Sequence, residues 1–175
     1  NAQFDVFVQD PKGYSNPEWW KFSPNAEAWR QAMTEPRPST FKGDERPREM
    51  VCWYEAMAFC NWLSDRLGIT VSLPTIAEWQ RAFQGDTDNE FPWGNTFNEQ
   101  YCNTQESRLK MTTLVNAYDE GVSPFGVYDM AGNVWEWCLN LSQDADFDTD
   151  PAKSGPRIVR GGSFISPGHR SKVLF

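Results

Sequence analysis

Two carboxylates, Asp129 and Glu136, lie on either side of a Gly-Asn turn, and two tryptophans enclose the second of them. Charges this close to large aromatic side chains are costly to desolvate, so each needs water, a backbone donor or a cation beside it. With the carbonyl groups of Gly132 and Val134 they form an oxygen-only ligand set within eight residues. Such a set suits calcium better than zinc or copper. The alternative is that both carboxylates accept backbone N–H bonds and cap the turn.

The soft ligands of the chain do not form a recognisable metal or catalytic pattern. The spacings of Cys52, Cys60, Cys102 and Cys138 match no zinc motif, and His169 is the only histidine. We expect reduced, buried thiols rather than a disulfide scaffold, with a Cys102–Cys138 metal pair as the minor alternative. A serine hydrolase is disfavoured because no nucleophile-elbow motif accompanies the histidine. We expect His169 on a surface loop, and a ligand-contacting role is the alternative.

Composition narrows the classes of protein. The net charge is −8 and the lysines and arginines are scattered, which argues against a nucleic-acid or anionic-membrane surface. No apolar run is long enough to span a bilayer, so no membrane insertion is expected. There is no signal-like apolar region at the start, but the sequence does not begin with methionine. Cytoplasmic and cell-surface or virion locations therefore both stay open.

The first half of the chain is predicted to be helical. Apolar periodicity indicates helices over residues 1–8, 17–32 and 50–67, the last ended by Gly68. Thr75 and Glu78 form a capping-box pattern that begins a further helix, which runs to about Phe83. These helices are expected to position the segments that follow.

From residue 86 the chain changes to short apolar pieces between Gly, Pro, Asn and Asp, typical of short strands joined by long loops. The expected strands lie within residues 91–95, 114–118, 126–128, 134–139 and 157–160. Residues 144–150 are predicted to be a mobile acidic loop. Helices followed by a loop-rich antiparallel sheet give an α+β fold class.

Five sequence pieces occur in one order along the chain. They are Trp53-Tyr-Glu-Ala, Leu73-Pro-Thr-Ile-Ala-Glu-Trp79, Phe91-Pro-Trp-Gly-Asn95, Gly132-Asn-Val-Trp-Glu-Trp137 and Val159-Arg-Gly-Gly-Ser-Phe164. Together they resemble the formylglycine-generating-enzyme family, also called the sulfatase-modifying-factor domain, a branch of the C-type-lectin-like fold. The resemblance implies one domain over residues 1–175. It also implies a shortened C-terminus, because family members usually continue into a last strand.

The resemblance implies three possible functions. The first is a copper-dependent oxygenase, which needs two cysteine thiolates just after the Arg-Gly-Gly-Ser segment, where this chain carries Ser166 and Ser171. Neutral hydroxyls cannot replace thiolates for Cu(I). The second is an iron-dependent sulfoxide synthase, for which one histidine is too few. The third is non-catalytic ligand display, as in the variable proteins of diversity-generating retroelements.

We therefore expect no copper or iron and favour a non-catalytic module that binds a protein or other macromolecule. The alternatives are a formylglycine-generating oxygenase whose Cys pair is absent or substituted, and a structural domain of a larger protein. The expected ligand-binding residues are Phe164, Ile165, Ser166, Pro167, Gly168, His169, Arg170 and Ser171. The resemblance also matches the Asp129–Glu136 set to a structural calcium site, and Asn103 and Thr104 to a weaker one.

Overall fold

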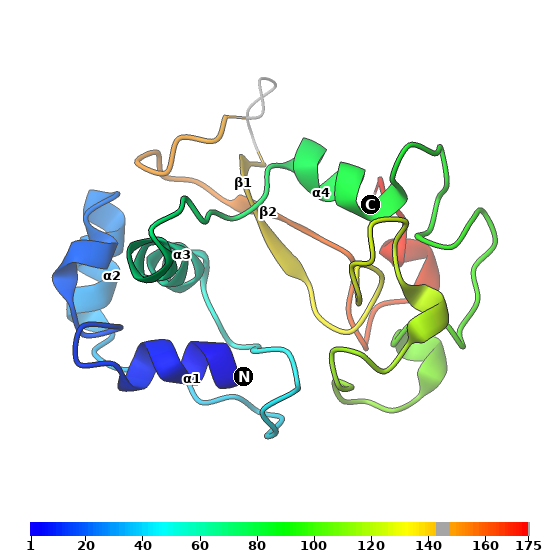
Figure 1. The fold of residues 1–175 in the computed structure, drawn as a ribbon, viewed down its shortest axis with the longest axis horizontal. Coiled ribbons are helices and arrows are strands. Elements are labelled where there is room, and N and C mark those ends of the chain that lie inside the picture. The colour runs from blue at the N-terminus through cyan, green and yellow to red at the C-terminus, as the bar shows by residue number, and fades with distance from the viewer. Residues whose placement is uncertain (143–147, 175) are drawn as a thin grey trace.

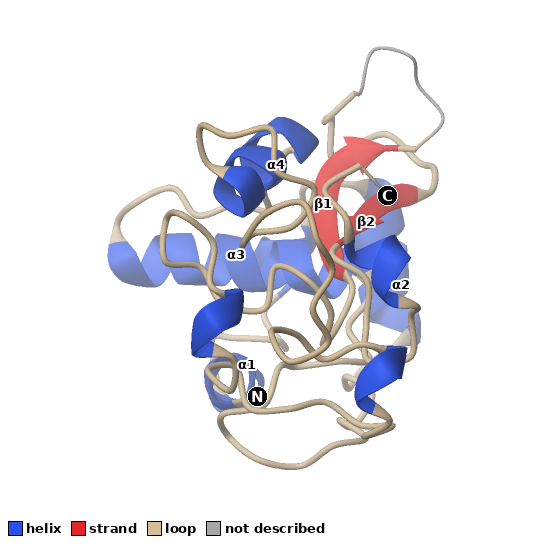
Figure 2. Ribbon diagram, turned by 90° about the vertical axis from the view of Figure 1, so that its right-hand side faces the viewer, coloured by secondary structure: helices blue, strands red, loops and turns tan. Residues whose placement is uncertain are grey.

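The computed structural model describes residues 1–142 and 148–174. The helices α1 (Ala2–Gln9), α2 (Pro24–Ala32) and α3 (Trp53–Leu67) form one side of the molecule, and α4 (Ile76–Gln84) lies beyond the small sheet (Figure 1). Short 3₁₀ helices are interspersed: η1 (Pro17–Trp20), η2 (Gln105–Ser107), η3 (Asp119–Gly121) and η4 (Gly168–Ser171). Figure 2 shows that the opposite side consists mostly of loops.

The predicted helices are present with shifted ends. Asn1 precedes α1, but its side-chain amide does not cap that helix and instead donates to the carbonyls of Phe41 and Gly43 at 3.2 and 2.9 Å. The single helix expected over residues 17–32 is wrong: η1 ends and a new helix begins at Pro24, where the Ser23 hydroxyl caps the Asn25 N–H. Pro24 suits the first helical position because it has no N–H to satisfy there.

Local capping signals define α3 and α4. Glu55 accepts the Cys52 N–H at 2.8 Å, which starts α3 three residues after the predicted residue 50, and Gly68 ends it in the left-handed conformation with φ 66°. The predicted capping box at Thr75 and Glu78 is confirmed, with the Glu78 N–H donating to the Thr75 hydroxyl at 3.2 Å. These contacts span three residues or fewer, so the sequence could specify them.

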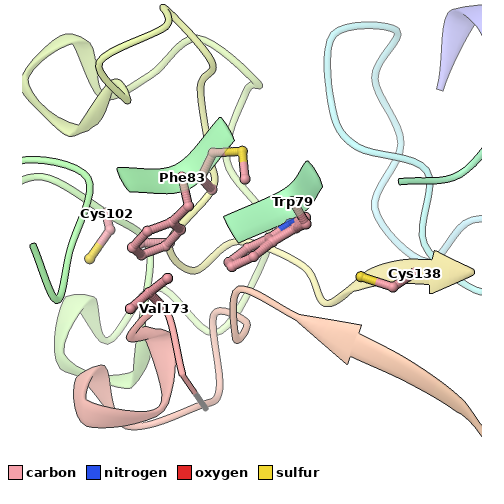
Figure 3. Packing of buried hydrophobic residues seen from close by; sticks show 7 residues of the cluster. Trp79, Phe83, Cys102, Cys138 and Val173 are labelled. Carbon is pink, nitrogen blue, oxygen red and sulfur yellow. The ribbon is translucent and has the colours of Figure 1, made fainter. Parts of the chain in front are cut away.

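Aromatic side chains fill two cores. One joins α1, η1 and α3 through edge-on ring contacts, such as Phe7 with Tyr14 at 5.6 Å. The second lies under α4, where Trp79 and Phe83 pack with Cys102 and Val173 (Figure 3). The second core connects α4 to the loop-rich half and to the end of the described chain.

Within the described residues the sheet has two strands, β1 (Glu136–Leu141) and β2 (Arg157–Arg160). They pair antiparallel with Glu136 opposite Arg160, and the register is irregular between Trp137 and Leu141. The strands predicted over 114–118 and 126–128 are wrong, and 91–95 forms only a bridge between Phe91 and Gly94. In these segments, backbone N–H groups form hydrogen bonds within turns instead of with a partner strand; for example, the Gly126 N–H donates to the Ser123 carbonyl.

The predicted acidic loop lies partly outside the described residues, which exclude 143–147. No helix in the described part of the chain is long and apolar enough to cross a membrane.

Candidate functional site

Asp129 and Glu136 accept hydrogen bonds from side chains, and among the described residues no backbone N–H reaches them as the turn-capping alternative requires. The Asn133 amide donates to Asp129 Oδ2 at 3.0 Å, and the Trp79 indole N–H donates to Glu136 Oε2 at 2.5 Å. Asp129 and Asn133 both adopt positive φ, at 58° and 61°. This is the left-handed conformation that aspartate and asparagine tolerate better than most residues. The turn is therefore a strained one, fixed by its surroundings.

Both carboxylates are unusually basic. Burial raises the pKa of Asp129 to about 6, although the hydrogen bond from Asn133 acts to lower it. Burial also raises the pKa of Glu136 to about 7, and the charge of Asp129 adds to the effect although the Trp79 bond opposes it. Glu136 as a residue is half-buried and lines a groove between α1, α3 and the 134–137 segment, while its carboxylate is enclosed by protein and bonded to Trp79. Two such groups close together favour a proton or a cation.

The donor chemistry of this turn fits calcium. Both groups are hard oxygen ligands, and in the described structure no backbone hydrogen bond reaches the carbonyls of Gly132 and Val134. Nowhere among the described residues do three or more His, Cys, Asp or Glu side chains lie close enough together to hold a metal ion. An ion here would thus depend on backbone oxygens to complete its shell. Calcium at Asp129, Gly132, Val134 and Glu136 stays a prediction.

Gly132 is required by a close approach of two backbone segments. It forms a bridge with Asn103, and a Cβ added at Gly132 would lie 2.4 Å from the Asn103 carbonyl oxygen. The Asn133 N–H donates to that same carbonyl at 2.8 Å. The candidate calcium turn is therefore joined directly to the segment that begins at Asn103.

Asn103 itself is fully buried and forms a hydrogen-bonding centre. Its amide nitrogen donates to Met111 O at 2.9 Å and to Asn133 Oδ1 at 3.2 Å, and its amide oxygen accepts from the Ser107 hydroxyl at 2.9 Å. The Thr104 hydroxyl donates to Glu106 at 2.7 Å. These bonds engage the side chains predicted for the weaker calcium site, which also stays a prediction.

The four cysteines are all free. Cys52 is partly buried beside α3, while Cys60, Cys102 and Cys138 are buried. Cys102 and Cys138 lie on opposite sides of Trp79 and Phe83 in Figure 3, so the fold does not bring them together. Burial raises the pKa of Cys102 to about 12 and that of Cys138 to about 11, which keeps both thiols neutral.

The C-terminal segment predicted to bind ligand divides into exposed and buried residues. Ile165, His169 and Arg170 are exposed, and His169 is thus on the surface as predicted. Phe164 and Pro167 are half-buried. Ser166, Gly168 and Ser171 are buried.

The serines at the positions matched to the copper ligands are packed inside. Ser166 shares a 3.0 Å hydrogen bond with the Ser163 hydroxyl and accepts the Ser163 N–H at 3.1 Å. The Ser171 hydroxyl has no hydrogen-bond partner among the described residues. These hydroxyls are not the soft thiolates that Cu(I) selects, and the expected absence of copper stays a prediction.

Sequence reasoning missed Glu106, which fixes this segment. Both of its carboxylate oxygens accept the Gly168 N–H, at 3.0 and 3.1 Å, across 62 residues of sequence. The Gln105 N–H donates to Ser166 O at 2.9 Å beside it. Burial raises the pKa of Glu106, but the bonds from Gly168 and Thr104 outweigh it and lower that pKa overall. Nothing in the local sequence signals a contact so distant.

Comparison with known proteins gives the family. A profile of the FGE-sulfatase family, described as "Sulfatase-modifying factor enzyme 1-like domain", matches residues 1–175. The chain belongs to this family.

Relatives within the FGE-sulfatase family differ in what their names say of activity. The inactive C-alpha-formylglycine-generating enzyme 2 of Mus musculus is 32% identical over 170 residues, covering 89% of this chain and 50% of that protein. The formylglycine-generating enzyme of Thermomonospora curvata is 33% identical over 171 residues, covering 84% and 53%. The chain thus spans about half the length of these relatives. Family membership alone does not decide catalysis.

Solved structures confirm the predicted α+β, formylglycine-generating-enzyme type of fold. Treponema denticola variable protein 1 aligns with a TM-score of 0.67 and 28% identity, covering 83% of this chain and 72% of that one. PvdO from Pseudomonas aeruginosa aligns with a TM-score of 0.62 at 20% identity, covering 84% and 67%, a likeness of fold alone.

Proposed function

We propose that this domain is a non-catalytic binding module that presents the exposed part of its C-terminal segment to a protein ligand. The observation that carries the proposal is the pair Ser166 and Ser171, two buried residues at the positions matched to copper-binding cysteines. Without thiolates there, this family domain has no ligands for the copper oxygenase. The similarity to a variable protein and to a family member named as inactive also supports a non-catalytic role.

The anchoring of the segment suits recognition. Glu106 and Gln105 hold its middle, and the Val173 N–H donates to Glu90 O at 3.1 Å near its end. His169 and Arg170 stay at the surface between these anchors, and the exposed Ile165 lies directly before the first of them. Since the backbone is already ordered, ligand binding would cost little conformational entropy. Variation of exposed side chains would then change specificity without changing the fold.

In the same proposal, calcium has a structural role. Asp129, Glu136 and the carbonyls of Gly132 and Val134 would hold it, and the ion would neutralise two buried carboxylates. Because Asn133 joins this turn to both Asn103 and Phe164, the ion would stabilise the base of the binding segment.

The experiment is a display library in which Ile165, His169 and Arg170 are randomised, selected against a panel of purified proteins. We expect target-specific binders whose melting temperatures stay close to that of the parent. A matched library at the buried Ser163, Ser166 and Ser171 should instead yield mostly unfolded variants.

The proposal fails if the exposed-residue library folds but yields no binder above the parent background. It also fails if the purified domain binds Cu(I) and oxidises a cysteine-containing peptide. That second outcome would favour the oxygenase alternative.

A further inference from the structure

A shallow surface hollow lies where the loop after η2 meets the C-terminal segment. It is lined by Gln105, Arg108, Lys110, Phe164 and Ile165. Two of these residues are cationic, two are apolar and none is acidic. Glu106 lies next to these residues in η2, but its carboxylate accepts bonds from Gly168 and Thr104. On a chain of net charge −8, this is a local concentration of positive charge.

The two cations are held in an uncommon backbone conformation. Arg108 and Lys110 have φ values of 59° and 56°, in the left-handed region that long side chains rarely adopt. The buried Asn103 fixes both ends of this loop, by accepting from the Ser107 hydroxyl and donating to Met111 O. Strain of this kind persists only where surrounding contacts impose it, and it concentrates at functional sites.

Apolar surface accompanies the charge. Ile165 is 66% exposed, and Leu109 and Met111, on either side of Lys110, are 49% and 38% exposed. Phe164 is fixed by an edge-on contact with Phe41 at 5.4 Å. Exposed apolar side chains next to fixed cations are typical of interaction surfaces.

We propose that this hollow binds an acidic segment of a partner protein that carries apolar side chains between its carboxylates. Arg108 and Lys110 would pair with the carboxylates, while Phe164 and Ile165 would contact the apolar groups. Charge complementarity selects this occupant, because the rest of the domain is acidic and would repel a uniformly charged polyanion. Two cations are also too few for the phosphate contacts that nucleic-acid binding needs. The inference rests on the proposed function and names the ligand class of the same segment.

The test uses the purified 175-residue chain and a synthetic heptapeptide that alternates glutamate with leucine and phenylalanine (ELEFELE). We expect amide NMR shifts at residues 105–110 and 164–165, and affinity that falls as salt rises from about 0.05 to about 0.5 M. The double variant Arg108→Glu/Lys110→Glu should weaken binding about tenfold or more. Lys12→Glu/Lys21→Glu, an equal charge change at two exposed residues outside the hollow, should leave it within about twofold.

Two further peptides separate the contributions. Replacing glutamate by lysine should abolish binding, and replacing leucine and phenylalanine by serine should weaken it several-fold. The inference is overturned if the charge-reversed variant keeps its melting temperature and binds equally well. It is also overturned if the lysine peptide or a single-stranded oligonucleotide binds as tightly. If the display library still gives binders after such a result, the proposed function stands and only this ligand class is wrong.

Discussion

Removing the charge of Glu136 should stabilise the folded protein at pH 8 when calcium is absent. The folded state raises the pKa of this carboxyl from 4.5 to about 7 by burial. At pH 8 the folded chain therefore holds a desolvated negative charge that the unfolded chain exposes to water. Below about pH 4 both states are protonated and the difference vanishes. The contribution of Glu136 to stability thus falls as pH rises from about 4 to about 7.

The magnitude follows from the two pKa values. The difference between 4.5 and about 7 corresponds to about 3 kcal/mol of destabilisation at pH 8. Glu136→Gln removes this charge and keeps an oxygen to accept the Trp79 N–H. For a chain of this length about 3 kcal/mol corresponds to a rise of about 6–12 °C in melting temperature. Asp129→Asn should act in the same direction, because burial raises its pKa from 3.8 to about 6.

The assay is thermal unfolding of the wild type and Glu136→Gln in excess chelator at pH 8 and pH 5. The two melting temperatures should differ at pH 8 and converge toward pH 5. Calcium should raise the wild-type value at pH 8 and leave the variant nearly unchanged, since an ion bound only by the folded state stabilises it. Glu99→Gln, at an exposed carboxylate, is the control and should change neither value. A variant that melts below the wild type at pH 8 in chelator would refute the reasoning on burial, and a wild type insensitive to calcium would refute the ion.

Three further perturbations test the contacts around this turn. Asn103→Ala removes three side-chain hydrogen bonds and should cost about 3 kcal/mol in urea unfolding, so a loss below about 1 kcal/mol would contradict its central role. Gly132→Ala places a Cβ 2.4 Å from the Asn103 carbonyl oxygen and should lower the free energy of unfolding more than Gly68→Ala, where φ is also positive but the space is open. Equal losses in the same assay would argue against the close approach. Glu106→Gln weakens the charge-assisted hydrogen bond to the Gly168 N–H, so hydrogen exchange at the Gly168 amide should become faster. Exchange at Phe83 in α4 should stay slow and is the control. Unchanged exchange at Gly168 would exclude the anchoring role.

The sequence by itself determined the features that depend on neighbouring residues or on residue type. The capping box at Thr75 and Glu78 and the helix end at Gly68 involve contacts within a few residues, and both were predicted correctly. The family could be identified because its motifs are short and ordered along the chain. Ser166 and Ser171 carry no thiol, so neither position can supply a thiolate ligand in any fold.

The tertiary structure decided what depends on distant contacts. Glu106 reaches Gly168 across 62 residues, and Asn103 reaches Asn133 across 30, so no local pattern could reveal either bond. Only the fold shows that Ser166, Gly168 and Ser171 are buried while Ile165 stays exposed. Short apolar pieces were predicted as strands because a strand and a turn-bonded loop share the same local pattern. Only β1 and β2 found partner strands in the described chain, since strand formation depends on pairing and not on the segment alone.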